Sequence, residues 1–419
     1  MQRIIFHVDV NSAFLSWEAA KRVREGEQDI RLIPAAIGGD RDKRTGVILA
    51  KSIPAKKYGV TTGEPVAMAL RKCPDLFLAK PDFRLYERNS RAFMDICRKY
   101  APAVEKYSID ECFLDMAGTE KLYGDPVELA RRIKDEIRDT LGFTVNIGVA
   151  NNKLLAKMAS DFEKPDKVHT LFDGEIREKL WPLRVGELFT VGPATARKLE
   201  QAGITTIGAL AKASLLSIQA LLGQKMGRQV WEYANGRDES SVLTEAEEAK
   251  GYSISTTTEE DVVTAEQAYR ILLALADSVA ARMRSEGAKA YGVSVTIRGN
   301  DFKNRSHQKK LTEPTDITNE IYKLCRSLFD ELWDKHTPLR LLGIGLLNVT
   351  KEEYAQQCMF CDEGKDRARK LDRAVDDIRG RFGADTIMRG SVMGSGANVG
   401  KKYKAHMENK REGSRSIIL

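Results

Sequence analysis

The sequence lacks the features that would tie it to a membrane, an export route or a disulfide framework. Only 6 of its 419 residues are cysteine, and they are scattered, so a disulfide-rich secreted fold is excluded. No run of eighteen apolar residues occurs, which excludes a membrane-spanning helix. The first residues carry charge where a signal peptide needs an apolar core. We therefore expect a cytoplasmic protein with no membrane partner.

Zinc-binding clusters are also scarce. Cys358 and Cys361 form the only C-x-x-C pair, whereas a structural zinc site needs four ligands. No second pair and no nearby His-x-x-x-His completes a set, so we interpret the pair as a coincidence of spacing.

The composition that is present indicates several ordinary globular domains. A chain of 419 residues with 42% hydrophobic residues is too long for one core, and its length favours three or four compact units. The net charge of +7 is weak evidence for a polyanionic partner, because the distribution of charge matters more than its total.

The N-terminal part of the chain mixes strands and helices without a strict βαβ rhythm, so an α+β fold is favoured. The helix that starts at Asp125-Pro126 has the clearest boundaries, an N-cap followed by proline and a terminal Gly142. The predicted strands are residues 4–10, 45–51 and 143–150, a strand or hairpin is predicted at 103–116, and the helices are 12–25, 125–141 and 152–162.

Beyond residue 171 the pattern changes twice. Residues 172–237 have short helices and glycine-rich turns, and residues 238–250 are polar and weakly periodic, as in a linker. A split βαβ unit of order βαββαβ follows, with Thr264 and Gln267 in a capping box. Its predicted strands are 252–258, 290–298, 302–310 and 339–349, its helices are 264–285 and 316–335, and an amphipathic helix is predicted at 364–382.

Three carboxylates are the candidates for catalysis. Asp9 ends the first strand, and Asp110 and Glu111 lie in Tyr107-Ser-Ile-Asp-Glu-Cys-Phe-Leu-Asp115. Phosphoryl transfer to a sugar hydroxyl uses two metal ions about 3.5–4 Å apart, and Mg²⁺ prefers oxygen ligands. Adjacent side chains on a straight strand point to opposite faces, so a bend or bulge is expected to turn both carboxylates inward. The alternative is a solvated turn, but the apolar flanks favour a buried site.

Four ordered segments resemble signature segments of the Y-family translesion DNA polymerases of the impB/mucB/samB type. They are His7-Val-Asp-Val-Asn-Ser-Ala-Phe14, Gly38-Gly-Asp through Gly46-Val-Ile-Leu-Ala-Lys-Ser, the Tyr107–Asp115 segment, and Gly148 through Lys164-Pro165. The resemblance extends over roughly residues 1–350. It implies a right-hand architecture of palm, fingers, thumb and little finger. It also implies error-prone, template-directed DNA synthesis past damaged bases, as in bacterial DNA repair and the SOS response.

The resemblance implies a role for each carboxylate. Asp9 and Asp110 would bridge two Mg²⁺ ions, and Glu111 would bind the ion that activates the primer hydroxyl. The carbonyl group of Val10 would complete the coordination of the nucleotide-side ion.

The nucleotide-binding positions follow the family less closely. Phe14 falls at the steric gate that excludes a ribose 2′-OH, although from its own context it would be a core phenylalanine. Lys164 falls where the family grips the dNTP triphosphate, and Lys157 either assists or is solvated. Many members have Tyr-x-x-Arg where this chain has Ile53-Pro-Ala-Lys56. Since Lys56 supplies a point charge without the arginine fork, we expect a weaker triphosphate grip.

A further departure concerns the subgroup within the family. Asn11 stands where many members have aspartate. Together with Ile53, with Ala55-Lys56 and with Gly63-Glu-Pro65, this residue brings the chain closer to the catalytic subunit of bacterial DNA polymerase V than to DNA polymerase IV. All three metal carboxylates remain, so the departures do not imply loss of activity.

Two segments resemble the DNA-binding parts of the family. Leu188 to Ile204 resembles a helix-hairpin-helix, whose turn binds a DNA phosphate through backbone N–H groups. The second α+β unit resembles the little finger, and its basic residues would follow a phosphate backbone; a solvated face is the alternative. The hairpin contacts would be Gly192, Ala194, Thr195 and Lys198 or Arg197. The basic stripe is Arg282, Arg284, Lys289, Arg298, Lys303, Arg305, Lys309 and Lys310, with Arg298, Lys303 and Arg305 as the expected DNA contacts.

The resemblance also sets the expected domains and partners. The domains would be palm 1–13 and 80–171, fingers 14–79, thumb 172–237, linker 238–250, little finger 251–350 and tail 351–419. In the tail, Gln356-Gln-Cys-Met-Phe360 resembles the peptide that bacterial polymerases insert into the β sliding clamp, through Gln356, Met359 and Phe360. An ordinary linker is the alternative. We expect a monomer that binds primer–template DNA and dNTP.

Two other functions are compatible with parts of the sequence. A non-catalytic DNA-binding scaffold that keeps the polymerase fold would explain Ile53 and Asn11, but not the three intact carboxylates. A palm-fold nucleotidyl cyclase would explain the metal site, but not the hairpin motif or the basic sheet.

The steric-gate assignment predicts an effect of Phe14→Ala on sugar selection. Removing the aromatic ring should raise incorporation of ribonucleotides relative to deoxyribonucleotides, because the ring would no longer exclude the 2′-OH. Primer extension with matched rNTP and dNTP substrates measures the ratio. Unchanged sugar discrimination would remove Phe14 from the gate.

Overall fold

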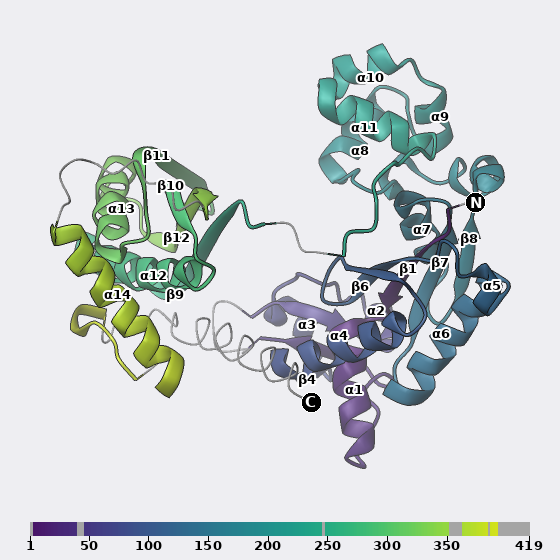
Figure 1. Cartoon of the computed structure of the whole chain (residues 1–419), viewed down its shortest axis with the longest axis horizontal. Coiled ribbons are helices and arrows are strands. Elements are labelled where there is room, and N and C mark those ends of the chain that lie inside the picture. The colour runs from purple at the N-terminus through teal and green to yellow at the C-terminus, as the bar shows by residue number, and fades with distance from the viewer. Residues whose placement is uncertain (1–2, 40–45, 245–247, 352–362, 384–385, 393–419) are drawn as a thin grey trace. The chain divides into compact units, whose positions relative to one another are not determined.

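The computed structural model describes residues 3–39, 46–244, 248–351, 363–383 and 386–392 (Figure 1). The described residues up to 244 form one compact unit, and those from 248 onward form another. In these ranges no helix combines the length and the apolar character needed to cross a bilayer. Cys358, Cys361 and the clamp-peptide residues Gln356, Met359 and Phe360 lie outside the described residues.

A five-stranded sheet forms the centre of the first unit. Its order is β5-β6-β1-β7-β8, with β7 and β8 parallel and the other pairs antiparallel. The strands are β1 Ile5–Val10, β5 Ala103–Lys106, β6 Glu111–Asp115, β7 Val145–Ala150 and β8 Val168–Leu171. The predicted hairpin at residues 103–116 is therefore confirmed as β5 and β6.

The two faces of this sheet pack against different helices. Alternate β1 side chains such as Phe6 and Val8 enter the core beneath α4 and α6, whereas Ile5 enters the core formed with α7, as the two-residue period of a strand requires. A β-carbon at Gly148 on β7 would lie 1.9 Å from the carbonyl oxygen of Ala156 on α7. Only glycine permits this close approach. The helices of this part are α1 Ala13–Arg24, α4 Phe83–Arg98, α5 Glu120–Tyr123, α6 Pro126–Leu141 and α7 Lys153–Ser160.

Local signals account for the boundaries of α6. The Asp125 side chain accepts hydrogen bonds from two backbone N–H groups of the first turn, Pro126 opens the helix, and Gly142 ends it at φ 78°. These are the N-cap, proline and C-cap preferences on which the prediction depended, and the predicted helix is confirmed.

A smaller sheet lies between α1 and α4 in the chain. Its order is β3-β2-β4, with β2 and β3 antiparallel and β2 and β4 parallel. Its elements are β2 Ala35–Gly38, β3 Ile48–Lys51, α2 Ile53–Lys57, α3 Val66–Lys72 and β4 Phe77–Ala79. The strands contain only three or four residues, which explains why the sequence pattern indicated one of them and missed two.

The helical segment after β8 packs on the α7 side of the central sheet through a shared core. Its elements are η1 Asp173–Glu175, η2 Ile176–Leu180, η3 Val185–Glu187, α8 Pro193–Gln201, α9 Ile207–Lys212, α10 Leu215–Leu222 and α11 Gln224–Ala234. The described residues between 238 and 250 form no helix or strand.

The second unit has the predicted order βαββαβ. Its sheet runs β11-β10-β12-β9, all antiparallel, and α12 and α13 pack on one face of it (Figure 1). The capping box of Thr264 and Gln267 is present at the start of α12. The elements are β9 Gly251–Val262, α12 Ala265–Ser285, β10 Lys289–Gly299, β11 Asn304–Thr315, α13 Thr318–Leu332 and β12 Leu339–Thr350.

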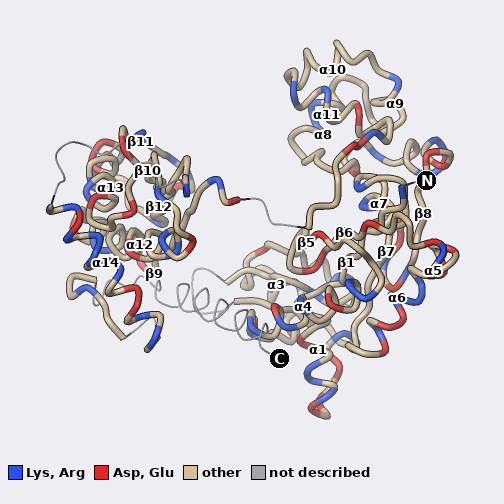
Figure 2. The backbone as a smooth tube through the Cα atoms, viewed as in Figure 1, with Lys and Arg blue, Asp and Glu red and all other residues tan. Residues whose placement is uncertain are grey.

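The C-terminal helix α14 (Glu363–Phe382) is attached to this unit by charged side chains, and a short turn, η4 (Gly390–Val392), packs against α12. Both signs of charge occur along α14 (Figure 2). Arg284 of α12, whose side chain is 6% exposed, donates to Asp376 at 2.7 Å and lies 3.5 Å from Asp372. Arg379 of α14 donates to Asp277 of α12 at 2.7 Å. Arg284 therefore does not belong to a solvent-facing basic stripe, and this expectation is wrong.

Replacing Arg284 should destabilise the second unit. Arg284→Met leaves two carboxylates of α14 without this partner, and removing one member of a buried ion pair costs about 3–5 kcal/mol. Arg367→Met removes an exposed charge from the same helix and should change stability by less than about 0.5 kcal/mol. Denaturant unfolding of both full-length variants measures the difference. Equal stability of the two variants would contradict the anchoring role of Arg284.

Candidate active site

Strand pairing brings two of the three candidate carboxylates together. β1 and β6 pair with Asp9 opposite Glu111, and both side chains share the sheet face that bears His7, two residues before Asp9. Antiparallel partners lie on the same face. Asp9 is 8% exposed, so its carboxylate requires compensation.

The predicted bend is present immediately before β6. The backbone N–H groups of Tyr107 and Ser108 both donate to the carbonyl of Glu111 at 3.1 Å. The Ser108 hydroxyl donates to the Asp110 carboxylate at 2.6 Å, and the Val10 N–H donates to the Asp110 carbonyl at 3.0 Å. The turn thus fixes Asp110 beside the end of β1.

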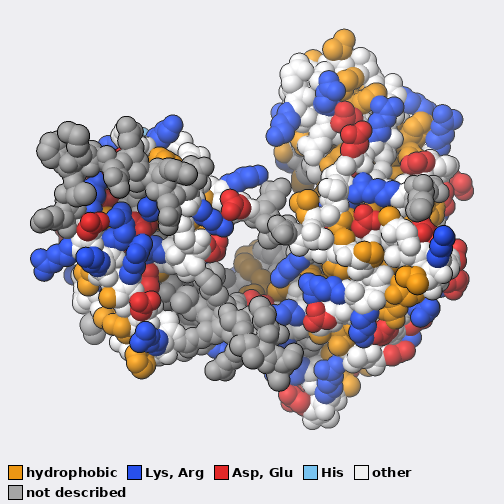
Figure 3. All heavy atoms as spheres, viewed as in Figure 1, with side chains coloured by type: hydrophobic (Ala, Val, Ile, Leu, Met, Phe, Trp, Pro, Cys, Tyr) orange, Lys and Arg blue, Asp and Glu red, His pale blue; other side chains and the backbone are white. Residues whose placement is uncertain are grey.

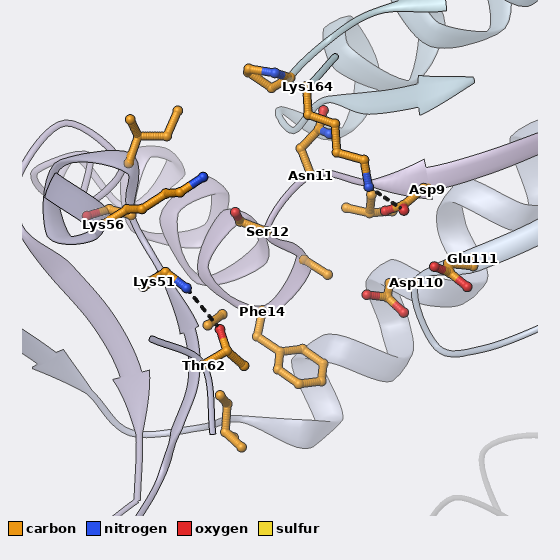
Figure 4. A pocket seen from close by; sticks show the side chains of 17 residues that line it. Asp9, Asn11, Ser12, Phe14, Lys51, Lys56, Thr62, Asp110, Glu111 and Lys164 are labelled. Carbon is orange, nitrogen blue, oxygen red and sulfur yellow. Dashed lines mark hydrogen bonds and ion pairs between the residues drawn. The ribbon is translucent and has the colours of Figure 1, made fainter. Parts of the chain in front are cut away.

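A pocket of about 490 Å³ opens between these strands, α1 and the small sheet (Figure 4). The carboxylates lie along one wall, and lysine side chains lie along the wall formed by β3 and α2. Its lining includes every predicted metal- or nucleotide-binding residue, namely Asp9, Val10, Phe14, Lys56, Asp110, Glu111 and Lys164.

Lys164 compensates the charge of Asp9. Its ammonium group donates to Asp9 Oδ2 at 2.7 Å and lies 2.8 Å from Asp161. Burial nevertheless outweighs this lysine and raises the pKa of Asp9 to about 6. Lys164 therefore compensates the Asp9 carboxylate only in part, and a divalent cation would compensate it more strongly.

Lys157 compensates the charge of Glu111. Its ammonium group donates to Glu111 Oε1 at 2.9 Å, whereas His7 Nε2 lies 3.8 Å from Glu111 Oε2, too far for a hydrogen bond. Burial raises the pKa of Glu111, but these neighbours outweigh it and hold the pKa at about 2. Lys157 is buried at 9% exposure, with its ammonium group 5.6 Å from the centres of the Tyr107 and Phe189 rings. The alternative of a solvated Lys157 is therefore wrong.

Asn11 has a structural reason to be an amide. Its nitrogen donates to Asn146 at 3.1 Å, and its oxygen accepts from the Thr144 hydroxyl and the Asp166 N–H at 3.0 Å. An aspartate could not donate the first of these bonds. The amide thereby connects β1 to the segment that carries Lys164.

The residues after Asn11 form an uncapped helix start at the pocket. Ser12 is the N-cap of α1 with φ 47° and makes no side-chain cap hydrogen bond. Ser12, Ala13 and Phe14 all line the pocket. The first N–H groups of a helix lack intrahelical partners, and they suit an anionic ligand.

Phe14 is held in a cluster of aromatic rings. Its ring stacks on that of Tyr86 at 4.6 Å and 14°, meets the Phe83 ring edge-on and is tilted relative to the Trp17 ring. Figure 4 places the ring at the floor of the pocket. Phe14 thus combines a packing role with a surface that a ligand would touch.

The donor set fits magnesium in its chemistry. Three carboxylates and one carbonyl at the edge of one pocket are all oxygen ligands, which Mg²⁺ prefers. In the ranges that the structure describes, no three His, Cys, Asp or Glu side chains are gathered closely enough to hold an ion. Lys164 and Lys157 instead supply the positive charge at Asp9 and Glu111.

The sequence patterns missed Lys51 and Thr62, which also line the pocket. Lys51 ends β3, and its ammonium group donates to the Thr62 hydroxyl at 3.4 Å. A lysine after Ile48-Leu-Ala50 in an otherwise apolar strand was the available signal. No sequence signal marked Thr62, which lies in a loop after α2.

The expected helix-hairpin-helix contacts lie at one helix terminus. Gly192 is the N-cap of α8, Ala194 and Thr195 lie in its first turn, and Lys198 lies one turn later. These residues and the carboxylate pocket are separate groups within the first unit.

The expected little-finger contacts divide between two faces of the second sheet. Arg298 of β10 lies on the face away from the helices and donates to Asn304 at 2.7 Å. Arg305 of β11 pairs with Ile297, a core residue, and its guanidinium group contacts Asp334 at 2.9 Å. Lys303 lies in the turn between the strands. Basic side chains also gather near α12 and α14 on the face shown in Figure 3.

Opposite pKa shifts predict opposite stability effects at the two paired carboxylates. Asp9 has a raised pKa, so its stability contribution is lost as the pH rises from about 4 through about 6. Without divalent metal at pH 7.5, Asp9→Asn should stabilise the protein by about 1–3 kcal/mol.

Glu111 has a lowered pKa, and its contribution to stability is lost as the pH falls from about 4.5 to about 2. Glu111→Gln should therefore destabilise by about 1–3 kcal/mol. Denaturant unfolding in EDTA tests both signs, and a destabilised Asp9→Asn would contradict the account.

Comparison with known proteins identifies the family. The profile described as the impB/mucB/samB family matches residues 8–161, and its C-terminal domain profile matches residues 249–359. A profile described as the DNA polymerase-iota thumb domain matches residues 186–238. The solved structure of a Y-family DNA polymerase chimera of Dbh and Dpo4 has a TM-score of 0.72 at 24% identity, covering 83% of this chain and 100% of that chain. This likeness establishes the same fold.

Relatives match over nearly the full length. DNA polymerase IV of Clostridium acetobutylicum is 44% identical over 395 residues, which cover 94% of this chain and 99% of the relative. DNA polymerase IV of Clostridium kluyveri is 36% identical and covers 95% of this chain and 100% of the relative. DNA polymerase IV 2 of Bacillus subtilis is 34% identical over 96% of this chain and 99% of the relative.

These relatives correct the subgroup. The placement nearer to DNA polymerase V depended on Asn11 and on a few residues between Ile53 and Pro65, whereas the likeness to DNA polymerase IV extends over 395 residues. A few exchanged side chains reflect the local environment, such as the hydrogen bonds that the side-chain amide of Asn11 makes. The chain belongs to the impB/mucB/samB family of Y-family DNA polymerases, with relatives named DNA polymerase IV.

Proposed function

We propose that this chain is a DNA polymerase IV that copies damaged templates. It would transfer deoxynucleotides from dNTP to a primer 3′-OH as the template directs. The observation that carries this proposal is that Asp9, Asp110, Glu111 and Phe14 line one pocket, with lysines on the opposite wall.

The proposed reaction is an in-line displacement. The primer 3′ oxygen attacks the α-phosphorus of the dNTP, its proton is released, and pyrophosphate leaves. Two Mg²⁺ ions would activate the hydroxyl and stabilise the charge on the phosphates. Asp9 and Asp110 would hold both ions, with Glu111 and the Val10 carbonyl each completing one of them.

Other residues would position the nucleotide. The uncapped start of α1 and the ammonium groups of Lys56 and Lys164 would bind the triphosphate, and Phe14 would exclude a ribose 2′-OH. The ion pair between Lys164 and Asp9 would have to break for a metal ion to bind Asp9. Its second partner, Asp161 at 2.8 Å, would keep it near the pocket.

Two surfaces would hold primer–template DNA. The start of α8, with Gly192, Ala194, Thr195 and Lys198, would bind one phosphate, and the helix-free sheet face with Arg298 would bind others. Lys303 and Arg305 would add charge at the edge of the sheet.

The domain boundaries given above (palm 1–13 and 80–171, fingers 14–79, thumb 172–237, little finger 251–350) are part of this proposal. So are a monomeric, cytoplasmic state and a β sliding clamp peptide at Gln356–Phe360.

Primer extension tests the proposal. With primed template, Mg²⁺ and dNTPs, the chain should extend the primer, and Asp110→Ala should slow extension by at least about a hundredfold, since several kcal/mol of charge stabilisation disappear. Asp115→Ala, a change of a carboxylate at the far end of β6 that does not line the pocket, is the matched control. Absence of extension by the wild-type protein with any divalent metal would instead support a non-catalytic scaffold.

A further inference from the structure

The wall of the pocket opposite the carboxylates carries two lysines close together. Lys51 ends β3, Lys56 lies on α2, and both line the pocket. Figure 4 shows both side chains on this wall, facing the space between it and Asp9. Of the two, only Lys56 falls on a position for which the sequence resemblance gives a nucleotide-binding role.

The positive charge of this wall is not neutralised within the described parts of the chain. Neither Lys51 nor Lys56 takes part in an ion pair between described residues. The carboxylate that acts on Lys51 electrostatically is Glu64, and Glu64 is bound to Lys72 at 2.6 Å. Burial and the charge of Lys56 lower the pKa of Lys51. Two neighbouring ammonium groups repel each other, so an anion between them would remove an unfavourable interaction.

A hydrogen bond orients the first of these lysines. The Lys51 ammonium group donates to the Thr62 hydroxyl at 3.4 Å. Leu49 and Ala50, the two residues before it on β3, also line the pocket. The strand and the loop therefore direct the lysine into the pocket rather than into solvent.

We propose that Lys51, oriented by Thr62, forms with Lys56 a two-lysine site that binds the oxygens of the incoming nucleotide's triphosphate. This inference rests on the proposed polymerase function and adds a residue to it. An arginine fork makes two parallel hydrogen bonds to phosphate, and a single lysine supplies one point charge. Lys51 supplies the second charge that Lys56 and Ile53 cannot provide, so the weak triphosphate grip expected from Ile53 and Lys56 does not follow.

The same charge could in principle meet a phosphate of the template strand. Both ligands present phosphate oxygens, but they differ in whether they compete with free oligophosphate. Inorganic tripolyphosphate is therefore the diagnostic probe. It carries the phosphate chain of a dNTP and has neither base nor sugar.

The test compares Lys51→Met with Lys57→Met in the full-length protein. Lys57 is an exposed lysine of α2 outside the pocket lining, so its variant removes the same charge nearby. For Lys51→Met, the KM for dNTP and the inhibition constant of tripolyphosphate should both rise about tenfold, corresponding to about 1.4 kcal/mol. The kcat and the Kd for primer–template DNA should stay within about twofold, and thermal melting should be unchanged. Lys57→Met should match the wild type in every measurement.

Two further variants examine the geometry. Thr62→Val should raise the tripolyphosphate inhibition constant in the same direction and by less, because the charge remains while its orientation is lost. Lys51→Arg should retain most of the affinity. An unchanged inhibition constant in Lys51→Met overturns the inference, and so does a rise confined to the Kd for DNA, which would assign Lys51 to the template. Failure of the wild type to extend a primer would reject the polymerase function instead.

Discussion

The pairing of β1 with β6 is the constraint on which the site depends. It sets Asp9 opposite Glu111, and the bend before β6 adds Asp110 at the end of the same strand pair. Because strand side chains alternate, the same register sends Phe6 and Val8 into the core beneath α4 and α6. A one-residue slip would turn the carboxylates into the core beneath α4 and α6 and would move Phe6 and Val8 to the face that now bears Asp9 and Glu111. Stability of the sheet and position of the carboxylates are therefore fixed by one register.

Charge compensation explains much of the surrounding structure. Lys164 and Lys157 each hold one carboxylate, and the amide of Asn11 anchors the segment that bears Lys164. The raised pKa of Asp9 shows that this compensation is incomplete. A site that is left with an unfavourable charge is suited to bind a cation. The opposite wall has the complementary property, since Lys51 and Lys56 concentrate positive charge there.

In the described part of the second unit, one face of the sheet packs against helices and the other face is free of them. Helices α12 and α13 cover one face of its sheet, and the other face bears Arg298. The helix α14 is attached by ion pairs, with Arg284 at their centre. Part of the basic character of this unit therefore serves internal structure, and the bases available to a polyanion are fewer than the composition suggests.

The sequence by itself determined the α+β class, the boundaries of α6, the βαββαβ order and the three carboxylates, because caps, strand alternation and motif order are local properties. It also determined the family, through segments that keep their order along the chain. Only the tertiary structure decided which charges are neutralised. Arg284 and Lys157 are buried in ion pairs, and Lys51 points into the pocket, because burial and partners depend on residues far away in sequence. Likewise, Asn11 reflects three hydrogen bonds to other segments rather than membership of another subgroup.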